Sequence, residues 1–295
     1  MFDNSKEYDA LVKLFVVVDD FIKLITTHVE NRLLPAYAYK RGRDKGLSLS
    51  ETIILALFRY QINIPDIQHY HNFLQAHYKQ DFPGLPNYEN FLKAIKAALP
   101  YATMMLKVIM YWNTKHNVGP SIVDSTPLAV CKIIRASSNK VARGYATRSK
   151  SSQGWWYGFK LHAICDELGN ILSVCFTTAN VDDRKKLDDL VKFITGELLA
   201  DAGYLSQQKQ EELAQKGVHL LACVRNNMKK IMTHEQHQKM KKRQMIEIVF
   251  SVLKERLGIV TTLARSILYF SCNYLYTILA YELGASDFSN LIPLS

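Results

Sequence analysis

The segment YGFKLHAICDELGNILSVCFTTA, residues 157–179, indicates the class of fold. Two runs rich in apolar and β-branched residues flank the turn-forming sequence DELGN, a pattern typical of a β-hairpin. Working outward, we expect further strands in PSIVDSTPLAV (120–130), ELLADAGY (197–204) and VHLLACVR (218–225). Helical patterns alternate with the later strands, so the order is β-β-β-α-β-α-β-α. This order predicts an α/β domain with a mixed sheet.

The expected helices of this domain are residues 181–194, residues 206–217 and residues 241–258. The last, KKRQMIEIVFSVLKERLG, has an apolar face at spacings of three and four residues: Ile246, Val249, Phe250, Leu253 and Leu257. Arg243, Glu247 and Lys254 then lie along one edge of that helix. A solvent-exposed charged edge is one interpretation, in which an Arg–Glu pair one turn apart contributes about 0.3–0.5 kcal/mol.

Residues 1–115 are predicted to be helical and to form a separate region, with the α/β domain in 116–295. Apolar residues mark one face of a first helix: Leu11, Leu14, Phe15, Val18, Phe21, Ile22 and Ile25. Ser48 and Glu51 have the spacing of a capping box before a second helix. Helices are also expected in QHYHNFLQAHY, in PNYENFLKAIKAAL and in YATMMLKVIMYWNTK. The pattern suits a helix-turn-helix-like DNA-binding module and a generic helical bundle equally well.

The amino-acid composition is that of a globular protein with an excess of basic residues. The 295 residues are 48% hydrophobic and carry a net charge of +10, with the basic surplus mainly in residues 116–295. A basic surface suggests a polyanionic partner, most simply nucleic acid, although charge alone is compatible with an ordinary basic protein. The five cysteines include no CxxC motif, and they favour reduced thiols in the cytosol over a zinc site or disulfides. No signal peptide or apolar membrane-spanning stretch is evident.

Three acidic residues lack a simple structural explanation. Asp124 interrupts the apolar run SIVDST, Asp201 follows the apolar run LLA, and Glu247 lies at the edge of a helix's core face. Taken singly, Asp124 suits a strand-ending turn and Asp201 a loop or a helix cap. Together they would converge in this order of elements, where carboxylate oxygens favour hard divalent cations such as Mg²⁺.

The chain resembles the DDE transposases of bacterial insertion sequences, closest to the insertion-sequence-982 family. The matching stretches are VDSTPL, WWYGFKLHAICDELGNILSVCFTTANVDDRKKL, LADAGYLS and RQMIEIVFSVLK. Related transposases carry Arg, then three residues, the catalytic Glu, six residues and a Lys. Here these are Arg243, Glu247 and Lys254, whereas the Tyr of the broader pattern is replaced by Met240.

The resemblance implies an RNase H-like, retroviral-integrase-like catalytic core preceded by the all-helical region. It implies that Asp124, Asp201 and Glu247 are the catalytic, metal-binding triad for Mg²⁺, with two ions expected and Mn²⁺ able to substitute. Arg243 and Lys254 would contact DNA phosphates. The expected partners are double-stranded DNA, as terminal inverted repeats and target, and a second copy in a homodimer, in a cytoplasmic, nucleoid-associated location.

Two basic segments are expected to be insertions that contact DNA, at about residues 132–152 and 225–243. Between residues 132 and 150 there are six basic residues and no acidic residue: Lys132, Arg135, Lys140, Arg143, Arg148 and Lys150. We expect a loop that becomes ordered on DNA, with an ordinary solvated loop as the alternative. Trp155 and Trp156 follow, and at least one is expected in the core while stacking on an unpaired base is possible for the other.

The predicted function is therefore metal-dependent cleavage and strand transfer at the ends of an insertion sequence. One alternative is a nuclease on the same core that cuts without joining. Another is a non-catalytic DNA-binding protein derived from a transposase, against which the three carboxylates argue.

Overall fold

The computed structural model describes residues 4–29, 46–151, 154–204, 206–222, 233–260 and 264–285. The chain forms two compact units. The helical unit comprises Met1–Leu106, Thr261–Leu263 and Leu268–Ser295, and the sheet unit comprises Lys107–Val260 and Ala264–Ile267. The predicted division at residues 115 and 116 differs from this grouping mainly at the C-terminal end, because residues 268–285 belong to a helix that packs within the helical unit.

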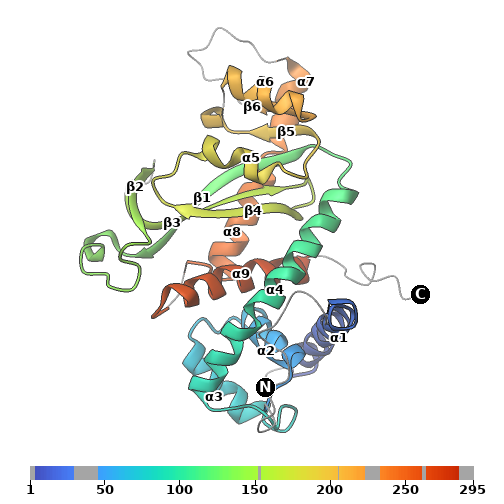
Figure 1. The fold of residues 1–295 in the computed structure, drawn as a ribbon, viewed down its shortest axis with the longest axis vertical. Helices are drawn as coiled ribbons and strands as arrows, with labels where there is room; N and C mark the ends of the chain where they lie inside the picture. The colour runs from blue at the N-terminus through green and yellow to red at the C-terminus, as the bar shows by residue number, and fades with distance from the viewer. Residues whose placement is uncertain are drawn as a thin grey trace. The chain divides into compact units, whose positions relative to one another are not determined.

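The helical unit contains α1 (Asn4–Val29), α2 (Leu49–Gln61), α3 (Ile67–His77), the first part of α4 (Tyr88–His116) and nearly all of α9 (Ile267–Ala285) (Figure 1). The predicted capping box begins α2: the Ser48 amide donates to Glu51 Oε2 at 2.6 Å, and the Glu51 amide donates to Ser48 Oγ at 3.1 Å. The predicted apolar face of α1 is buried except at Phe15, which is exposed.

The last two helices predicted for the N-terminal region are a single helix, α4, with Pro100 in its interior. The prediction of a break at this proline was wrong. A proline inside a helix removes one hydrogen bond and costs about 3 kcal/mol. Buried residues continue at helical spacing on both sides of it, and this packing favours an uninterrupted helix: Phe91, Ile95, Ala98, Ala102, Met105 and Ile109.

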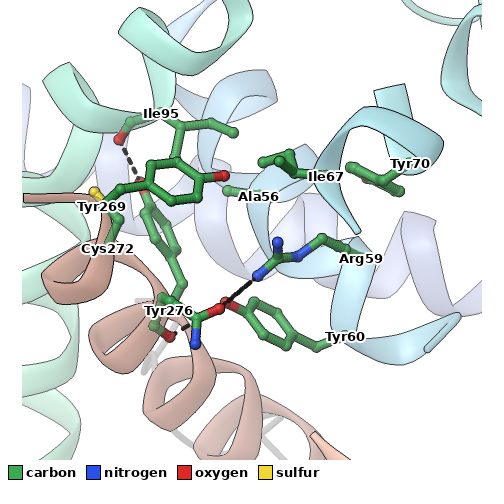
Figure 2. A pocket seen from close by; sticks show the side chains of 10 residues that line it. Ala56, Arg59, Tyr60, Ile67, Tyr70, Ile95, Tyr269, Cys272 and Tyr276 are labelled. Atoms are coloured by element: carbon green, nitrogen blue, oxygen red, sulfur yellow. Dashed lines mark hydrogen bonds between the residues drawn. The ribbon is translucent and has the colours of Figure 1, made fainter. Parts of the chain in front are cut away.

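A buried arginine links two helices of the helical unit. Arg59 on α2 donates through Nη2 to the hydroxyl of Tyr60 at 2.7 Å and to Asn273 Oδ1 on α9 at 2.9 Å (Figure 2). The hydroxyl of Tyr276, also on α9, donates to the Ile95 carbonyl on α4 at 3.1 Å. These bonds join α2, α4 and α9 through polar groups in an otherwise apolar interior. Within the described residues, none of the helices has the length and apolar character needed to cross a membrane.

The sheet unit is built on a sheet that is mixed, as predicted, and that has six strands rather than the five expected (Figure 1). Its strands are β1 (Ser121–Cys131), β2 (Thr147–Ser151), β3 (Gly154–Cys165), β4 (Ile171–Thr178), β5 (Gly196–Ala200) and β6 (Val218–Ala222). They are ordered β2-β3-β1-β5-β6, and β4 also pairs with β3. The β1–β5 and β5–β6 pairs are parallel, and the other pairs are antiparallel.

The quoted segment 157–179 forms the predicted hairpin of β3 and β4. Its turn is fixed by Asp166, whose carboxylate accepts hydrogen bonds from the amides of Leu168 and Asn170 at 2.9 Å. Gly169 has a φ of 93°, a conformation that glycine adopts without strain.

Two elements differ from the sequence-based expectation. The first basic segment contains a 3₁₀ turn, η2 (Ile133–Arg135), and the edge strand β2, so it is more ordered than a simple loop. The helix predicted at 181–194 is limited to the 3₁₀ turn η3 (Asp183–Lys186) and α5 (Leu187–Leu190). Only Leu187, Leu190, Val191 and Ile194 of this segment reach the core. These four side chains are enough to hold a short helical element against the core. The chain then turns at Gly196, where β5 begins.

The remaining elements are η4 (Ala202–Tyr204), α6 (Gln207–Gln215), α7 (His234–Lys241), α8 (Gln244–Ser251) and the π-helical turn η5 (Val252–Arg256). Gly217 follows α6 with a φ of 77°, as expected at the end of a helix. Ile246, Val249 and Phe250 of α8 are buried, and α8 contacts β1 and β3. The four described cysteines are free thiols, and Cys223 lies outside the described residues.

Candidate active site

The parallel pairing of β1 and β5 brings two of the predicted carboxylates together. Val123 on β1 is opposite Ala200 on β5. Asp124 and Asp201 directly follow this pair in the sequence. The parallel register therefore places them next to each other. Val123 and Ala200 are fully buried, and this packing fixes where the two acidic residues emerge. Asp124 is half-buried, whereas Asp201 is exposed just beyond the end of its strand.

The surroundings of Asp124 disfavour its charged form. Burial raises the pKa of Asp124 to about 6. A hydrogen bond from the Ser125 amide at 2.7 Å and the positive charge of Arg243 oppose this rise, and the negative charges of Asp201 and Asp183 add to it. Carboxylates that repel one another in a partly buried site form a place where a cation is stabilised.

Arg243 connects Asp124 to the third predicted carboxylate. Its Nη1 donates to Asp124 Oδ2 at 3.0 Å, and its Nη2 donates to Glu247 Oε1 at 2.5 Å. The guanidinium has its donors in a fixed planar fork, so one arginine can hold two acceptors at once. The arginine precedes α8 and the glutamate lies one turn into it, so the start of α8 sets both positions. The structure thus brings Asp124, Asp201, Arg243 and Glu247 to one region.

A second polar cluster near these carboxylates was not predicted from the sequence, because Asp183 falls in the first turn of the helix expected at 181–194. Asp183 Oδ1 lies 2.8 Å from Lys160 Nζ and 3.5 Å from Nδ1 of the buried His162. Burial lowers the pKa of His162 to about 4, so its ring is neutral at pH 7 and its contact with Asp183 is polar rather than ionic. The alternation of Lys160 and His162 on one strand was the signal in the sequence, since it places both on the same face.

Tyr204 closes this region from the loop that follows Asp201. Its ring is buried, and burial raises the pKa of its phenol. The charges of Asp183 and Asp124 contribute to the same rise, which shows that the hydroxyl lies near both acidic residues. A buried tyrosine at this point fixes the turn that carries Asp201.

The donor chemistry of the site fits a divalent cation that prefers oxygen ligands. Asp124, Asp201 and Glu247 offer only carboxylate oxygens, without the His or Cys ligands of a typical zinc site. Within the described ranges, however, no three His, Cys, Asp or Glu side chains are grouped closely enough to hold a metal ion as they stand. Glu247 is directed to Arg243, so it would have to turn from the guanidinium to join the two aspartates.

Lys254 is not brought to the carboxylates. It lies in the π-helical turn η5, where the Leu257 amide bonds the Val252 carbonyl at 3.0 Å, five residues back. Burial lowers the pKa of Lys254, and the largest opposing charge is that of Glu255 rather than Glu247. Arg243 and Glu247 therefore contact each other as their spacing predicts, whereas within the described residues no ion pair joins Lys254 to these carboxylates.

The basic residues of the first segment are exposed, and none of them contacts the carboxylates. They lie just before and on η2, on the loop that follows it and on β2: Lys132, Arg135, Lys140, Arg143, Arg148 and Lys150. The second basic segment, 225–243, lies partly outside the described residues. In its described part, Lys239 pairs with Glu197 and Glu235, and Lys242 pairs with Glu167.

Residues 114–267, more than half of the chain, match the family described as the transposase DDE domain. The chain belongs to the transposase DDE domain family. The match includes β1, β5 and α8, so all three predicted carboxylates lie inside the DDE domain. The helical region before residue 114 lies outside it, as does most of α9.

Among solved structures, the chain is similar to the piggyBac transposase in a cryo-EM structure of its synaptic complex with hairpin DNA. The sequences are 11% identical, the TM-score is 0.46, and the match covers 94% of this chain and 74% of that chain. This similarity is too weak to establish a shared fold. No curated protein matches the chain.

Proposed function

We propose that the chain is the transposase of a bacterial insertion sequence of the insertion-sequence-982 family. Its sheet unit would be an RNase H-like core that cuts DNA at the ends of the element and joins the freed ends to target DNA. The observation that carries this proposal is the juxtaposition of Asp124 and Asp201 on adjacent parallel strands, with Glu247 linked to Asp124 through Arg243.

Each of the three carboxylates would bind metal from a different element of the fold. Asp124 within β1 and Asp201 just after β5 would hold Mg²⁺ between them, and Glu247 would complete the ligand set from α8. When bound, two such ions, for which Mn²⁺ can substitute, would activate water or a 3′-hydroxyl and stabilise the leaving oxygen of a phosphodiester. Arg243 would position a phosphate beside Asp124, because a guanidinium binds phosphate with the same fork that it offers to carboxylates.

The DNA partner is proposed from charge. The six exposed basic residues of segment 132–150 would contact the backbone of the terminal inverted repeats or of target DNA. Lys254 would add a further phosphate contact, although burial lowers its pKa. Joining two ends requires two sites, so we propose that the active form is a homodimer in which each copy acts on one end.

The test uses a labelled duplex that carries one end of the element, taken from the DNA that flanks the gene, with Mg²⁺. Wild type is compared with Glu247→Gln, which removes the negative charge but keeps the size of the side chain. We expect the variant to bind the duplex normally and its cleavage rate to fall by more than about 100-fold. Replacing a residue that only hydrogen-bonds to a metal ligand usually lowers activity by about 10- to 100-fold. Glu255→Gln is the matched control, because Glu255 is exposed in η5, eight residues further along, and is expected to be silent.

The outcomes separate the alternatives. Nicking and joining by wild type but not by Glu247→Gln supports the proposal. Cutting without joining would favour a nuclease on the same core, and binding without either reaction would favour a DNA-binding protein. Equal cleavage by wild type and Glu247→Gln would exclude Glu247 from the ligand set.

A further inference from the structure

The strands β2 and β3 form a ribbon in which basic and aromatic side chains share one face. Arg148 is opposite Tyr157, and Lys150 is opposite Trp155. Side chains directly opposite each other in an antiparallel pair point to the same side of the sheet. The four residues therefore lie on one face of the ribbon. The loop 136–146 packs on Tyr157, whose hydroxyl donates to the Ala142 carbonyl at 3.2 Å, so the basic loop adjoins this same face.

The two adjacent tryptophans have different surroundings. Trp156 is buried with 8% of its surface exposed, whereas Trp155 is 60% exposed. Lys150 Nζ lies 6.0 Å from the centre of the Trp155 ring, within the range of a cation–π contact. Trp156 therefore contributes to the core, and most of the Trp155 ring remains open to solvent.

The six basic residues of segment 132–150 differ from about half of those elsewhere in the described part of the sheet unit. In the part of the chain that the structure describes, none of the six from Lys132 to Lys150 forms an ion pair with an acidic residue. Eight other basic residues of the same unit do: Lys160, Arg184, Lys186, Lys209, Lys216, Lys239, Lys242 and Arg243. Charges without protein counter-ions around an exposed aromatic ring are suited to a ligand that supplies both phosphates and flat rings.

We propose that Trp155, flanked by Lys150 and Arg148, stacks on an unpaired base of the DNA substrate. The inference rests on the proposed function and adds a substrate class to it: DNA in which a base near the reacting end has left the double helix. Bases inside a duplex already stack on their neighbours, so an open indole face selects a base that has lost such a neighbour. A protein partner is the weaker candidate, because protein interface cores are depleted of lysine.

The test measures binding of the full chain, in EDTA so that no cleavage occurs, to two labelled duplexes of one sequence. One duplex is fully paired, and the other has a single unpaired 2-aminopurine near the element end. We expect wild type to prefer the second duplex and to quench its fluorescence. Trp155→Ala should lose about 5- to 150-fold in affinity for that duplex and much less for the paired one. Trp155→Phe, which keeps an aromatic face, should retain most of the preference.

Phe193→Ala is the matched control. Phe193 is 63% exposed and has Lys192 at 5.5 Å over its ring, but it lies in a different loop of the same unit. We expect this variant to bind both duplexes as wild type does. Because Trp155 is exposed, its replacement should leave the melting temperature unchanged, which is checked by thermal unfolding.

The result that overturns the inference is equal binding of the two duplexes by wild type, or an unchanged preference in Trp155→Ala. If wild type still cleaves and joins with Mg²⁺ in that case, the proposed function stands without it. A Trp155→Ala protein that keeps its DNA preference but loses self-association would assign this face to a second copy and also overturn the inference. If wild type binds no DNA, the proposed function fails first, and the inference fails with it.

Discussion

At the scale of single residues, Arg243 connects two of the three candidate carboxylates. One guanidinium donates to Asp124 at 3.0 Å and to Glu247 at 2.5 Å, so it sets the distance between a strand residue and a helix residue. Lysine has the same charge but lacks the planar fork, so it cannot make both contacts in this geometry.

We expect Arg243→Lys to bind DNA nearly as well as wild type but to cleave it about 10- to 150-fold more slowly. The variant loses one hydrogen bond to a charged group, which contributes about 1.5–3 kcal/mol. Arg184→Lys is the control, because Arg184 also makes a forked contact, to Asp182, away from the site. Equal rates for Arg243→Lys and wild type would show that the fork is not used in the reaction.

Asp124 should make stability depend on pH. Burial raises its pKa to about 6, above the value of about 3.9 in an unfolded chain. The folded protein binds this proton more tightly, so the stabilisation is complete below about pH 4 and is lost as the pH rises through 6.

In EDTA, we therefore expect the free energy of unfolding of wild type to fall between pH 4 and 7, relative to Asp124→Asn, by up to about 3 kcal/mol. Denaturant unfolding at several pH values measures this difference. A difference between the two proteins that stays constant over the range would show that Asp124 keeps an ordinary pKa.

At the scale of elements, the segment 241–258 shows how local structure departs from a regular helix. The sequence pattern predicts one continuous helix, but α7 ends at Lys241, α8 begins at Gln244, and the π-helical turn η5 follows from Val252. In η5 the hydrogen bonds reach back five residues rather than four, so side chains leave the positions that a 3.6-residue period assigns. Of the predicted apolar face, Ile246, Val249, Phe250 and Leu253 are buried, whereas Leu257, which follows the π-helical turn, is only partly buried.

The pairing of β1 and β3 should depend on Gly158. A Cβ atom at this position would lie 2.1 Å from the Leu128 carbonyl oxygen on the neighbouring strand. We expect Gly158→Ala to lose about 3 kcal/mol of stability, as in overpacked cores, and roughly 6–12 °C in melting temperature. In Gly284→Ala the added atom meets open space in α9, so this control should keep or slightly raise the melting temperature. A similar melting temperature for Gly158→Ala and wild type would mean that β1 and β3 can separate at no cost.

At the scale of the whole molecule, the net charge is +10, but only some of the basic side chains that the structure describes lack an acidic partner. Many basic side chains of the sheet unit are neutralised by nearby carboxylates, whereas those of segment 132–150 are not. Charges without such partners are free to replace the counter-ions of DNA. Segment 132–150 holds six of them within nineteen residues, so it should contribute strongly to the salt dependence of binding.

We expect Arg148→Gln/Lys150→Gln to reduce the slope of log K against log salt by about 2, since each phosphate contact contributes about 0.9. The control is Lys209→Gln/Lys216→Gln, which removes the same charge from residues that pair with Asp188 at 2.8 and 2.7 Å. Its slope should match that of wild type. If both double variants change the slope equally, binding follows net charge rather than this surface.

The class of fold, the β3–β4 hairpin, the capping box of α2 and the candidate carboxylates could all be predicted from the amino-acid sequence. These features depend on short-range periodicity, turn chemistry and the cost of placing an acidic residue in an apolar run. The pairing of the carboxylates was decided by the tertiary structure, because the register of β1 and β5 depends on packing between residues about eighty positions apart. The same holds for the uninterrupted α4, the exposure of Trp155 beside the buried Trp156, and the cluster around Asp183. In each case, long-range packing determines which side chains are buried and which remain free to bind.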